Sequence, residues 1–155
     1  MRRAVAIAFL LFLACKKGDP IAETIHAVVH AAEDRDAEAV VEKLAANYAD
    51  ENGGRRDAEE ALKRYFFGYR SIKISLSDLK TFQTGPTAQA RFVVHFIGVP
   101  KEIGGLDQLL PSSATYRFEV WLAEEKGDWK ITAAQWHPEP KVAMTLAEKA
   151  VSESR

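Results

Sequence analysis

The stretch that decides the fold is residues 114–137, which read ATYRFEVWLAEEKGDWKITAAQWH. Two runs that alternate between apolar and polar residues flank the polar segment 124–128, which contains a glycine. Period-two alternation is typical of a β-strand with one face against a core, and a short polar connection with glycine is typical of a hairpin turn. The stretch therefore predicts a long β-hairpin.

Two more strands are expected before this hairpin. Residues 72–76 alternate cleanly and continue irregularly to Phe82, and residues 88–99 form a second alternating run after the turn at 84–86. In the last strand, Trp136 has the opposite parity to Ile131, which predicts either a bulge or two apolar faces. Together these segments predict a four-stranded antiparallel sheet.

Three helices are expected ahead of the sheet, because apolar residues recur there at helical spacing. The first covers residues 21–33, and the second carries apolar positions from Val40 to Tyr48 before Gly53 and Gly54 end it. A capping box beginning at Asp57 opens the third. The predicted fold is α+β: three N-terminal helices packed on a curved four-stranded antiparallel sheet, with a short C-terminal helix in the tail 141–155.

The first residues have the pattern of a lipoprotein signal peptide, assigned to residues 1–14. A basic start, MRR, precedes ten apolar residues, which are too few to span a bilayer as a stable helix. Residues 12–15, FLAC, resemble the bacterial lipobox, at which the signal is cut and the cysteine is lipid-modified. An ordinary secretory signal that happens to contain a cysteine is the alternative.

Cys15 is the only cysteine of the chain. In an oxidising compartment an unpaired thiol calls for an explanation, and modification with lipid, palmitate included, supplies one. We therefore expect a membrane anchor at Cys15, a tether over 15–20 and a domain over 21–140. A lysine, Lys16, and not an acidic residue follows the cysteine, and in this respect the chain resembles proteins sent to the outer membrane. This resemblance predicts a domain that faces the periplasm.

Charge and motif content exclude several classes of function. Loss of two arginines with the leader leaves 19 basic and 22 acidic residues, a net charge of −3, so nucleic acid is not an expected partner. His26 and His30 have the i, i+4 spacing of a metal pair but lack a third ligand, so we expect exposed histidines and no metal. No cofactor is expected.

The order of three helices and then a sheet, with LAANYADENGG at 44–54 and GDWKI at 127–131, resembles the nuclear transport factor 2-like superfamily. This superfamily includes ketosteroid isomerase-like and polyketide cyclase (SnoaL)-like proteins. The resemblance spans residues 21–137 and implies a cystatin-like cone, with a cavity between the concave sheet face and the helices. In its enzymes, a carboxylate and a donor such as tyrosine lie in that cavity.

Candidate pocket residues are polar side chains that this cone would bring together, and none of them matches an isomerase motif. They are Tyr48, Asp50, Tyr65, Arg91, His95, Arg117, Glu119 and His137. The candidates on the strands line the pocket only if their face of the sheet is concave. The opposite face carries Phe92, Phe96, Tyr116 and Phe118, and we favour the interpretation that these four side chains pack under the helices. No catalytic residue is assigned.

Three functions fit these observations. The first is a non-enzymatic envelope domain that binds a small apolar ligand or a protein. The second is a cavity enzyme that performs acid/base chemistry on a small hydrophobic substrate. The third is a homodimer that pairs through the outer sheet face, with Trp121 and Trp136 in the contact.

Overall fold

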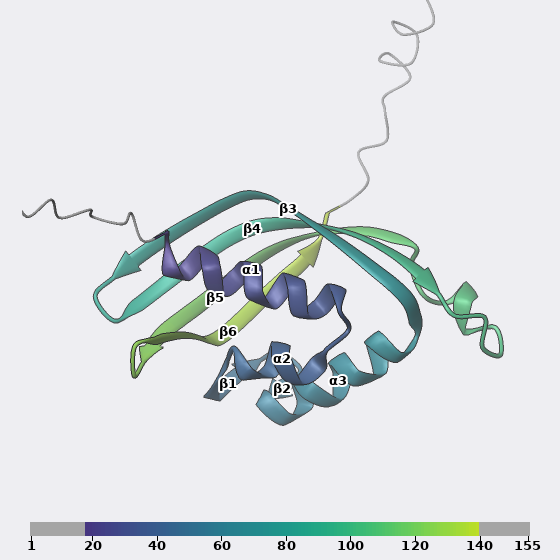
Figure 1. Cartoon of the computed structure of the whole chain (residues 1–155), viewed down its shortest axis with the longest axis horizontal. Helices are drawn as coiled ribbons and strands as arrows, with labels where there is room; N and C mark the ends of the chain where they lie inside the picture. The colour runs from purple at the N-terminus through teal and green to yellow at the C-terminus, as the bar shows by residue number, and fades with distance from the viewer. Residues whose placement is uncertain (1–17, 140–155) are drawn as a thin grey trace, which may run out of the picture.

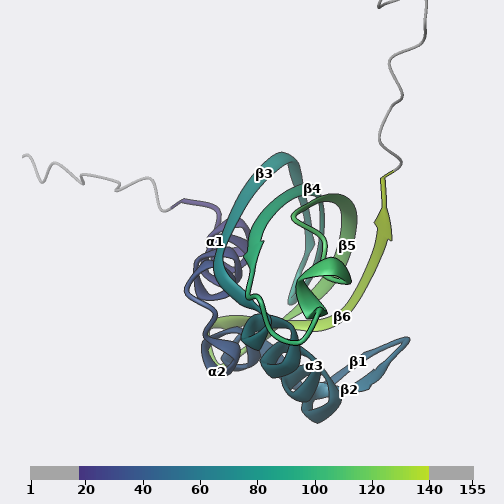
Figure 2. The same ribbon diagram turned by 90° about the vertical axis from the view of Figure 1, so that its right-hand side faces the viewer.

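A curved sheet of six strands arches over three helices in the computed structural model, which describes residues 18–139 (Figure 1). The helices lie on the concave side of the sheet, as the turned view shows (Figure 2). The elements are α1 (Pro20–Glu33), α2 (Ala37–Glu42), β1 (Leu44–Asp50), β2 (Gly53–Gly54), α3 (Arg55–Phe67), β3 (Tyr69–Thr84), β4 (Thr87–Pro100), η1 (Leu106–Gln108), β5 (Ser113–Glu125) and β6 (Asp128–Pro138).

Helix α1 confirms the first predicted helix. The Asp19 carboxylate accepts a hydrogen bond from the Ile21 amide at 2.9 Å, and Pro20 occupies the first turn, where its missing N–H costs nothing. Ile21 and Ile25 are each 2% exposed and face the sheet. His26 and His30 are exposed, as expected.

The second helix is shorter than predicted, because residues 44–50 form strand β1 instead of helix. Helix α2 ends at Glu42 and is followed by the C-cap Lys43, whose carbonyl accepts a hydrogen bond from the Ile131 amide at 2.8 Å. This contact starts a parallel pairing of β1 with β6. The pairing satisfies backbone N–H and C=O groups of β6 that would otherwise stay unpaired at the sheet edge. These strand–strand hydrogen bonds outweigh the local preference for a helix.

Helix α3 begins at Arg55, three residues before the start that a capping box at Asp57 predicts. Gly54 is the N-cap, and Asp57 is the third helical residue, whose carboxylate accepts from the Gly54 amide at 2.8 Å. The expectation that Asp57 itself caps the helix is therefore wrong, although Asp57 does satisfy a backbone donor at the helix start.

The sheet has the order β2-β1-β6-β5-β4-β3 and is mixed, because β1 runs parallel to β6. The four predicted strands are present as β3 to β6 and pair antiparallel. The expectation of a purely antiparallel four-stranded sheet is thus wrong at the edge that β1 and β2 add. Register shifts lie in β3 between Ser77 and Lys80, and in β6 opposite the step from Trp121 to Leu122.

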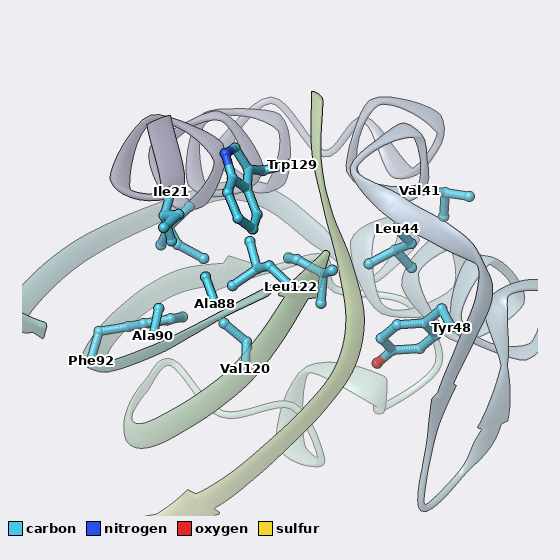
Figure 3. Close-up of a cluster of buried hydrophobic side chains, with 12 residues drawn as sticks. Ile21, Val41, Leu44, Tyr48, Ala88, Ala90, Phe92, Val120, Leu122 and Trp129 are labelled. Atoms are coloured by element: carbon cyan, nitrogen blue, oxygen red, sulfur yellow. The ribbon is translucent and has the colours of Figure 1, made fainter. Parts of the chain in front are cut away.

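The core lies between the helices and the concave face of the sheet. One cluster joins α1 and β1 to even-numbered residues of β4 and β5, including Phe92, Val120 and Leu122 (Figure 3). A second cluster joins α2 and α3 to the first half of β3 and includes Tyr69, which is fully buried, and Phe96. Even-numbered residues of β4 and β5 therefore point inward, as the aromatic parity indicated.

The proposed leader, Cys15 and the predicted C-terminal helix lie outside the described residues. Within residues 18–139, no helix is long and apolar enough to cross a bilayer.

Adjacent residues of β4 test which sheet face holds the core. Phe96 is 6% exposed and Ile97 is 61% exposed. Phe96→Ala should lower the free energy of unfolding by about 3–5 kcal/mol, because it leaves a cavity. The neighbouring control, Ile97→Ala, should change it by less than about 0.5 kcal/mol, since its side chain is largely in water. Urea unfolding followed by circular dichroism gives both values, and equal losses would contradict the assignment of the faces.

Candidate functional site: the concave aromatic face

Four aromatic side chains share the concave face of the central strands. Phe92, Phe118 and Trp136 are register partners across β4, β5 and β6. Their rings stack, with centroids 5.4 Å apart for Phe92 and Phe118 and 5.9 Å apart for Phe118 and Trp136. Tyr116 meets Phe118 edge-on at 6.4 Å. We call these four residues the aromatic shelf.

The shelf exists because of the irregularity in β6. Leu122 pairs with Ile131 and Trp121 pairs with Ala133, so Thr132 is an extra residue on β6. One extra residue reverses the side-chain parity, which brings Trp136 onto the concave face beside Phe118. Of the two alternatives that the sequence left open, a bulge or two apolar faces, the structure shows the bulge, and the expectation that Trp136 joins Trp121 on the outer face is wrong.

The shelf is only partly covered within the described part of the chain. Phe92 is 7% exposed and belongs to the core, whereas Tyr116, Phe118 and Trp136 are of intermediate exposure. Large aromatic surface that keeps contact with water favours an apolar partner, since burying it releases free energy.

Tyr48 and Asp50 come together at the neighbouring edge of the core. The Tyr48 hydroxyl donates to Asp50 Oδ2 at 2.6 Å, while Asp50 Oδ1 accepts from the Asn52 amide at 2.6 Å. Figure 3 shows the ring of Tyr48 in the core cluster with its hydroxyl directed away from Leu44. Burial, and then the nearby Asp50 carboxylate, raise the pKa of Tyr48 well above its usual value.

This geometry gives Asp50 a structural role. Both of its carboxylate oxygens are used, one by Tyr48 and one by the turn that leads from β1 into β2. A carboxylate engaged in this way is a poor general base, and a tyrosine with a raised pKa is a poor acid near neutral pH. The Tyr48–Asp50 pair is therefore better suited to hold the β1–β2 turn in place than to transfer a proton.

Tyr65 packs beneath Tyr69 and Phe96, away from Tyr48. The two tyrosine hydroxyls are 3.4 Å apart, and the Tyr69 hydroxyl donates to the Pro111 carbonyl at 2.8 Å. Because Tyr69 has one proton to donate, it acts as acceptor toward Tyr65. Burial, followed by this hydrogen bond, raises the pKa of Tyr65. The Tyr65 hydroxyl thus fixes the β4–β5 connection through Tyr69.

The remaining strand candidates lie on the convex face, opposite the helices. Arg91 contacts Glu119 through both Nε, at 3.1 Å, and a terminal nitrogen, at 3.0 Å. Arg117 pairs with Glu139, at 2.8 Å from Nε. Exposed ion pairs of this kind contribute about 0–1 kcal/mol each.

His95 lies between two hydroxyls on the same convex face. Its Nε2 is 3.0 Å from Ser77 Oγ, and its Nδ1 is 3.3 Å from Thr115 Oγ1. His137, the register partner of Arg117, is exposed as well. The structure therefore brings Tyr48 together with Asp50, but places Arg91, His95, Arg117, Glu119 and His137 outside the cone. Pairing of two copies through this face stays a prediction.

Two surface depressions lie away from the shelf. One, of about 530 Å³, lies between the α1–α2 junction and α3, next to Lys101, and is lined by charged side chains of both signs. The other, of about 360 Å³, lies beside Phe82 and Trp121. Within residues 18–139 no three His, Cys, Asp or Glu side chains are grouped as a metal would require.

No protein-family model and no curated protein matches this sequence. Solved structures match it well. A proposed dehydratase of the NTF2-like family from Streptomyces avermitilis aligns with TM-score 0.68 and 15% identity, over 79% of this chain and 96% of that one. This chain has the nuclear transport factor 2-like (NTF2-like) fold.

Two further neighbours show the range of this fold. A proposed aromatic ring hydroxylase from Novosphingobium aromaticivorans aligns with TM-score 0.67 and 18% identity, over 79% of this chain and 88% of that one. Bd1075 of Bdellovibrio bacteriovorus aligns with TM-score 0.65 and 13% identity, over 77% of this chain, which spans only 40% of Bd1075. At such identities the likeness extends to the NTF2-like fold and not to an activity.

The buried tyrosines predict a loss of stability in alkali. Their folded-state pKa values lie above the unfolded value of about 10, so their contribution is complete below pH 10 and is lost as pH rises beyond it. Between pH 8 and pH 11 the wild-type free energy of unfolding should fall, and Tyr48→Phe should reduce that fall. Urea unfolding at both pH values measures it. An equal fall in both proteins would show that Tyr48 ionises freely in the folded state.

Proposed function

We propose that this protein is a lipid-anchored bacterial envelope protein whose NTF2-like domain binds a small, planar, apolar ligand without transforming it. The observation that supports the binding role is the aromatic shelf, three members of which keep exposed surface on the concave face. A flat apolar molecule laid on Phe118 and Trp136 would extend the existing stack. Each such aromatic contact contributes about 0.5–1.5 kcal/mol beyond area burial.

The absence of catalysis is proposed from the hydrogen bonds of the polar groups near the core. The described hydroxyls of Tyr48, Tyr65 and Tyr69 and both oxygens of Asp50 have partners within the protein. A ligand on the shelf would thus find these three hydroxyls and the Asp50 carboxylate already engaged in hydrogen bonds within the protein.

The anchor is proposed from the sequence and from the position of α1. Only four residues separate Cys15 from Pro20, the first residue of α1. A fully extended chain of that length reaches roughly 17 Å. A lipid on Cys15 would therefore hold the α1 end of the domain close to the membrane; we place that membrane as the outer membrane and the domain in the periplasm.

Acid/base catalysis is the second candidate, favoured by the 2.6 Å contact between Tyr48 and Asp50. A dehydratase has been proposed for one neighbour of the same fold. An aryl ketone incubated with the protein in D₂O provides the test. Exchange at its α-carbon above the buffer rate, abolished in Asp50→Asn, would establish this candidate and overturn the non-enzymatic proposal.

Two tryptophans of intermediate exposure on opposite sheet faces offer a matched test of ligand binding. N-phenyl-1-naphthylamine, a neutral and fluorescent aromatic probe, should bind the wild-type protein saturably. Trp136→Ala should weaken its affinity by about tenfold or more, equivalent to at least ~1.4 kcal/mol. Trp121→Ala, on the convex face, should leave the affinity unchanged. If Trp121→Ala abolishes binding and Trp136→Ala does not, the concave site is refuted.

The lipid anchor is tested with the full chain in a Gram-negative bacterium. Wild-type protein should incorporate labelled palmitate and sediment with the outer membrane. Cys15→Ser removes the only thiol, so it should lose the label and accumulate with its leader attached. A variant at the adjacent position, Lys16→Ser, should keep the label. Labelling that persists in Cys15→Ser would eliminate the proposed anchor.

A further inference from the structure

A row of register partners crosses the convex face of the sheet near the β3–β4 turn. Phe82 of β3 pairs with Gln89 of β4, which pairs with Trp121 of β5, and Ala133 of β6 ends the row. Register partners of antiparallel strands direct their side chains to the same face. Two strand spacings, about 9.5 Å, separate β3 from β5, so the two aromatic side chains flank the glutamine.

This row forms the smaller of the two surface depressions, of about 360 Å³, which we call the convex groove. Its volume is at the lower end of the range of small-molecule sites, about 300–1,000 Å³. The described residues that line it include no charged side chain. The aromatic and polar lining residues are Phe82, Thr84, Thr87, Gln89, Trp121 and Thr132.

Both aromatic side chains of the groove keep contact with water. Phe82 is 51% exposed, and Trp121 is of intermediate exposure. The bulge in β6 places two small residues, Thr132 and Ala133, opposite Trp121, so no bulky side chain of β6 stands at this position of the row. A ligand that covers the two rings gains free energy, because it removes apolar surface from water.

Gln89 supplies a hydrogen-bond acceptor between the two rings. Its amide nitrogen donates to Glu119 Oε1, which also accepts from Arg91 Nε at 3.1 Å. This contact with a carboxylate assigns the nitrogen and leaves the amide oxygen, Oε1, as the acceptor for a ligand. Arg91 and Glu119 neutralise each other beside the groove.

The lining of the groove selects among classes of ligand. An ion meets no opposite charge among the described lining residues. A wholly apolar molecule would separate Gln89 and the threonine hydroxyls from water without replacing those hydrogen bonds, which is unfavourable. A sugar ring suits both features, because its C–H groups pack on aromatic rings and its hydroxyls hydrogen-bond at its edge.

We infer that the convex groove binds a neutral saccharide. One sugar ring lies over Gln89, between Phe82 and Trp121, and one of its hydroxyls donates to Gln89 Oε1. The groove and the aromatic shelf lie on opposite faces of the sheet. This inference therefore goes beyond the proposed function and does not depend on it.

The three tryptophans of the chain allow a direct test. Labelling with 5-fluorotryptophan gives one ¹⁹F signal each for Trp121, Trp129 and Trp136. The probes are maltotriose, cellotriose and tri-N-acetylchitotriose, each titrated to tens of millimolar. At least one of them should shift the Trp121 signal saturably. The signals of Trp129, in the core, and Trp136, on the concave face, should not move and serve as internal controls.

Two substitutions separate the aromatic feature of the groove from the polar one. Phe82→Leu keeps an apolar side chain but removes the flat ring, and Gln89→Met keeps the length of the side chain but removes its oxygen. Each should weaken saccharide binding by about threefold or more, as expected for one aromatic contact or one hydrogen bond. Ile97→Ala, which alters an exposed residue of β4 outside the groove, should leave the affinity unchanged.

Other outcomes would overturn the inference. One is that none of the three sugars shifts the Trp121 signal saturably. Another is that both groove variants bind as tightly as the wild-type protein. A Trp121 signal that responds to dilution of the protein and not to sugar would identify a second copy of the chain as the occupant of this face, which also overturns the inference.

Failure of the proposed function gives a different result. The wild-type protein would then not bind N-phenyl-1-naphthylamine, while its Trp121 signal would still respond to the sugar.

Discussion

The concave site depends on a single unpaired residue. Thr132 is inserted between Ile131 and Ala133, the partners of Leu122 and Trp121, and its hydroxyl donates to the Trp121 carbonyl at 3.2 Å. Without this bulge, strict alternation would keep Trp129 and Ile131 in the core but direct Trp136 outward. With it, the first half of β6 contributes core residues and the second half contributes Trp136 to the shelf. Residues of the core and a residue of the aromatic shelf thereby come from one strand.

The two faces of the sheet differ in their side chains and in what they contribute to stability. The concave face holds the apolar side chains of β4 and β5 against α1 and β1, so it supplies most of the stability. The convex face carries cross-strand polar pairs, whose separate contributions are small. Since the hydroxyls of Tyr48, Tyr65 and Tyr69 and the Asp50 carboxylate are hydrogen-bonded within the protein, the recognition that we propose for the concave side depends on aromatic surface. That arrangement favours a flat apolar ligand over a charged one.

Much of the fold was predictable because period-two alternation is a strong signal. Four strands and the helix α1 follow from the positions of apolar residues alone, whereas for β6 these positions left a bulge and two apolar faces as alternatives. Strand β1 was not predictable, since Leu44, Ala45 and Tyr48 also fit a helix, and pairing with β6 decides between the two. The start of α3 was misplaced because Gly54, which has no side chain, acts as the N-cap.

The site was less predictable than the fold. The parity of Phe92 and Phe118 indicated their inward direction, but the place of Trp136 required the exact position of the bulge. Arg91, His95, Arg117 and Glu119 shared a face in the sequence pattern, and only the packing of the helices shows that this face is convex. The contact of Tyr48 with Asp50 depends on the strand β1, which sequence periodicity does not reveal.

We propose that the concave aromatic shelf is the recognition surface of this NTF2-like domain. Intermolecular nuclear Overhauser effects between a bound aromatic probe and the ¹³C-labelled protein test it most directly. Binding on the shelf should give contacts from the probe to the rings of Tyr116, Phe118 and Trp136. Contacts to Trp121 and Phe82 on the convex side, with none to the shelf, would contradict it.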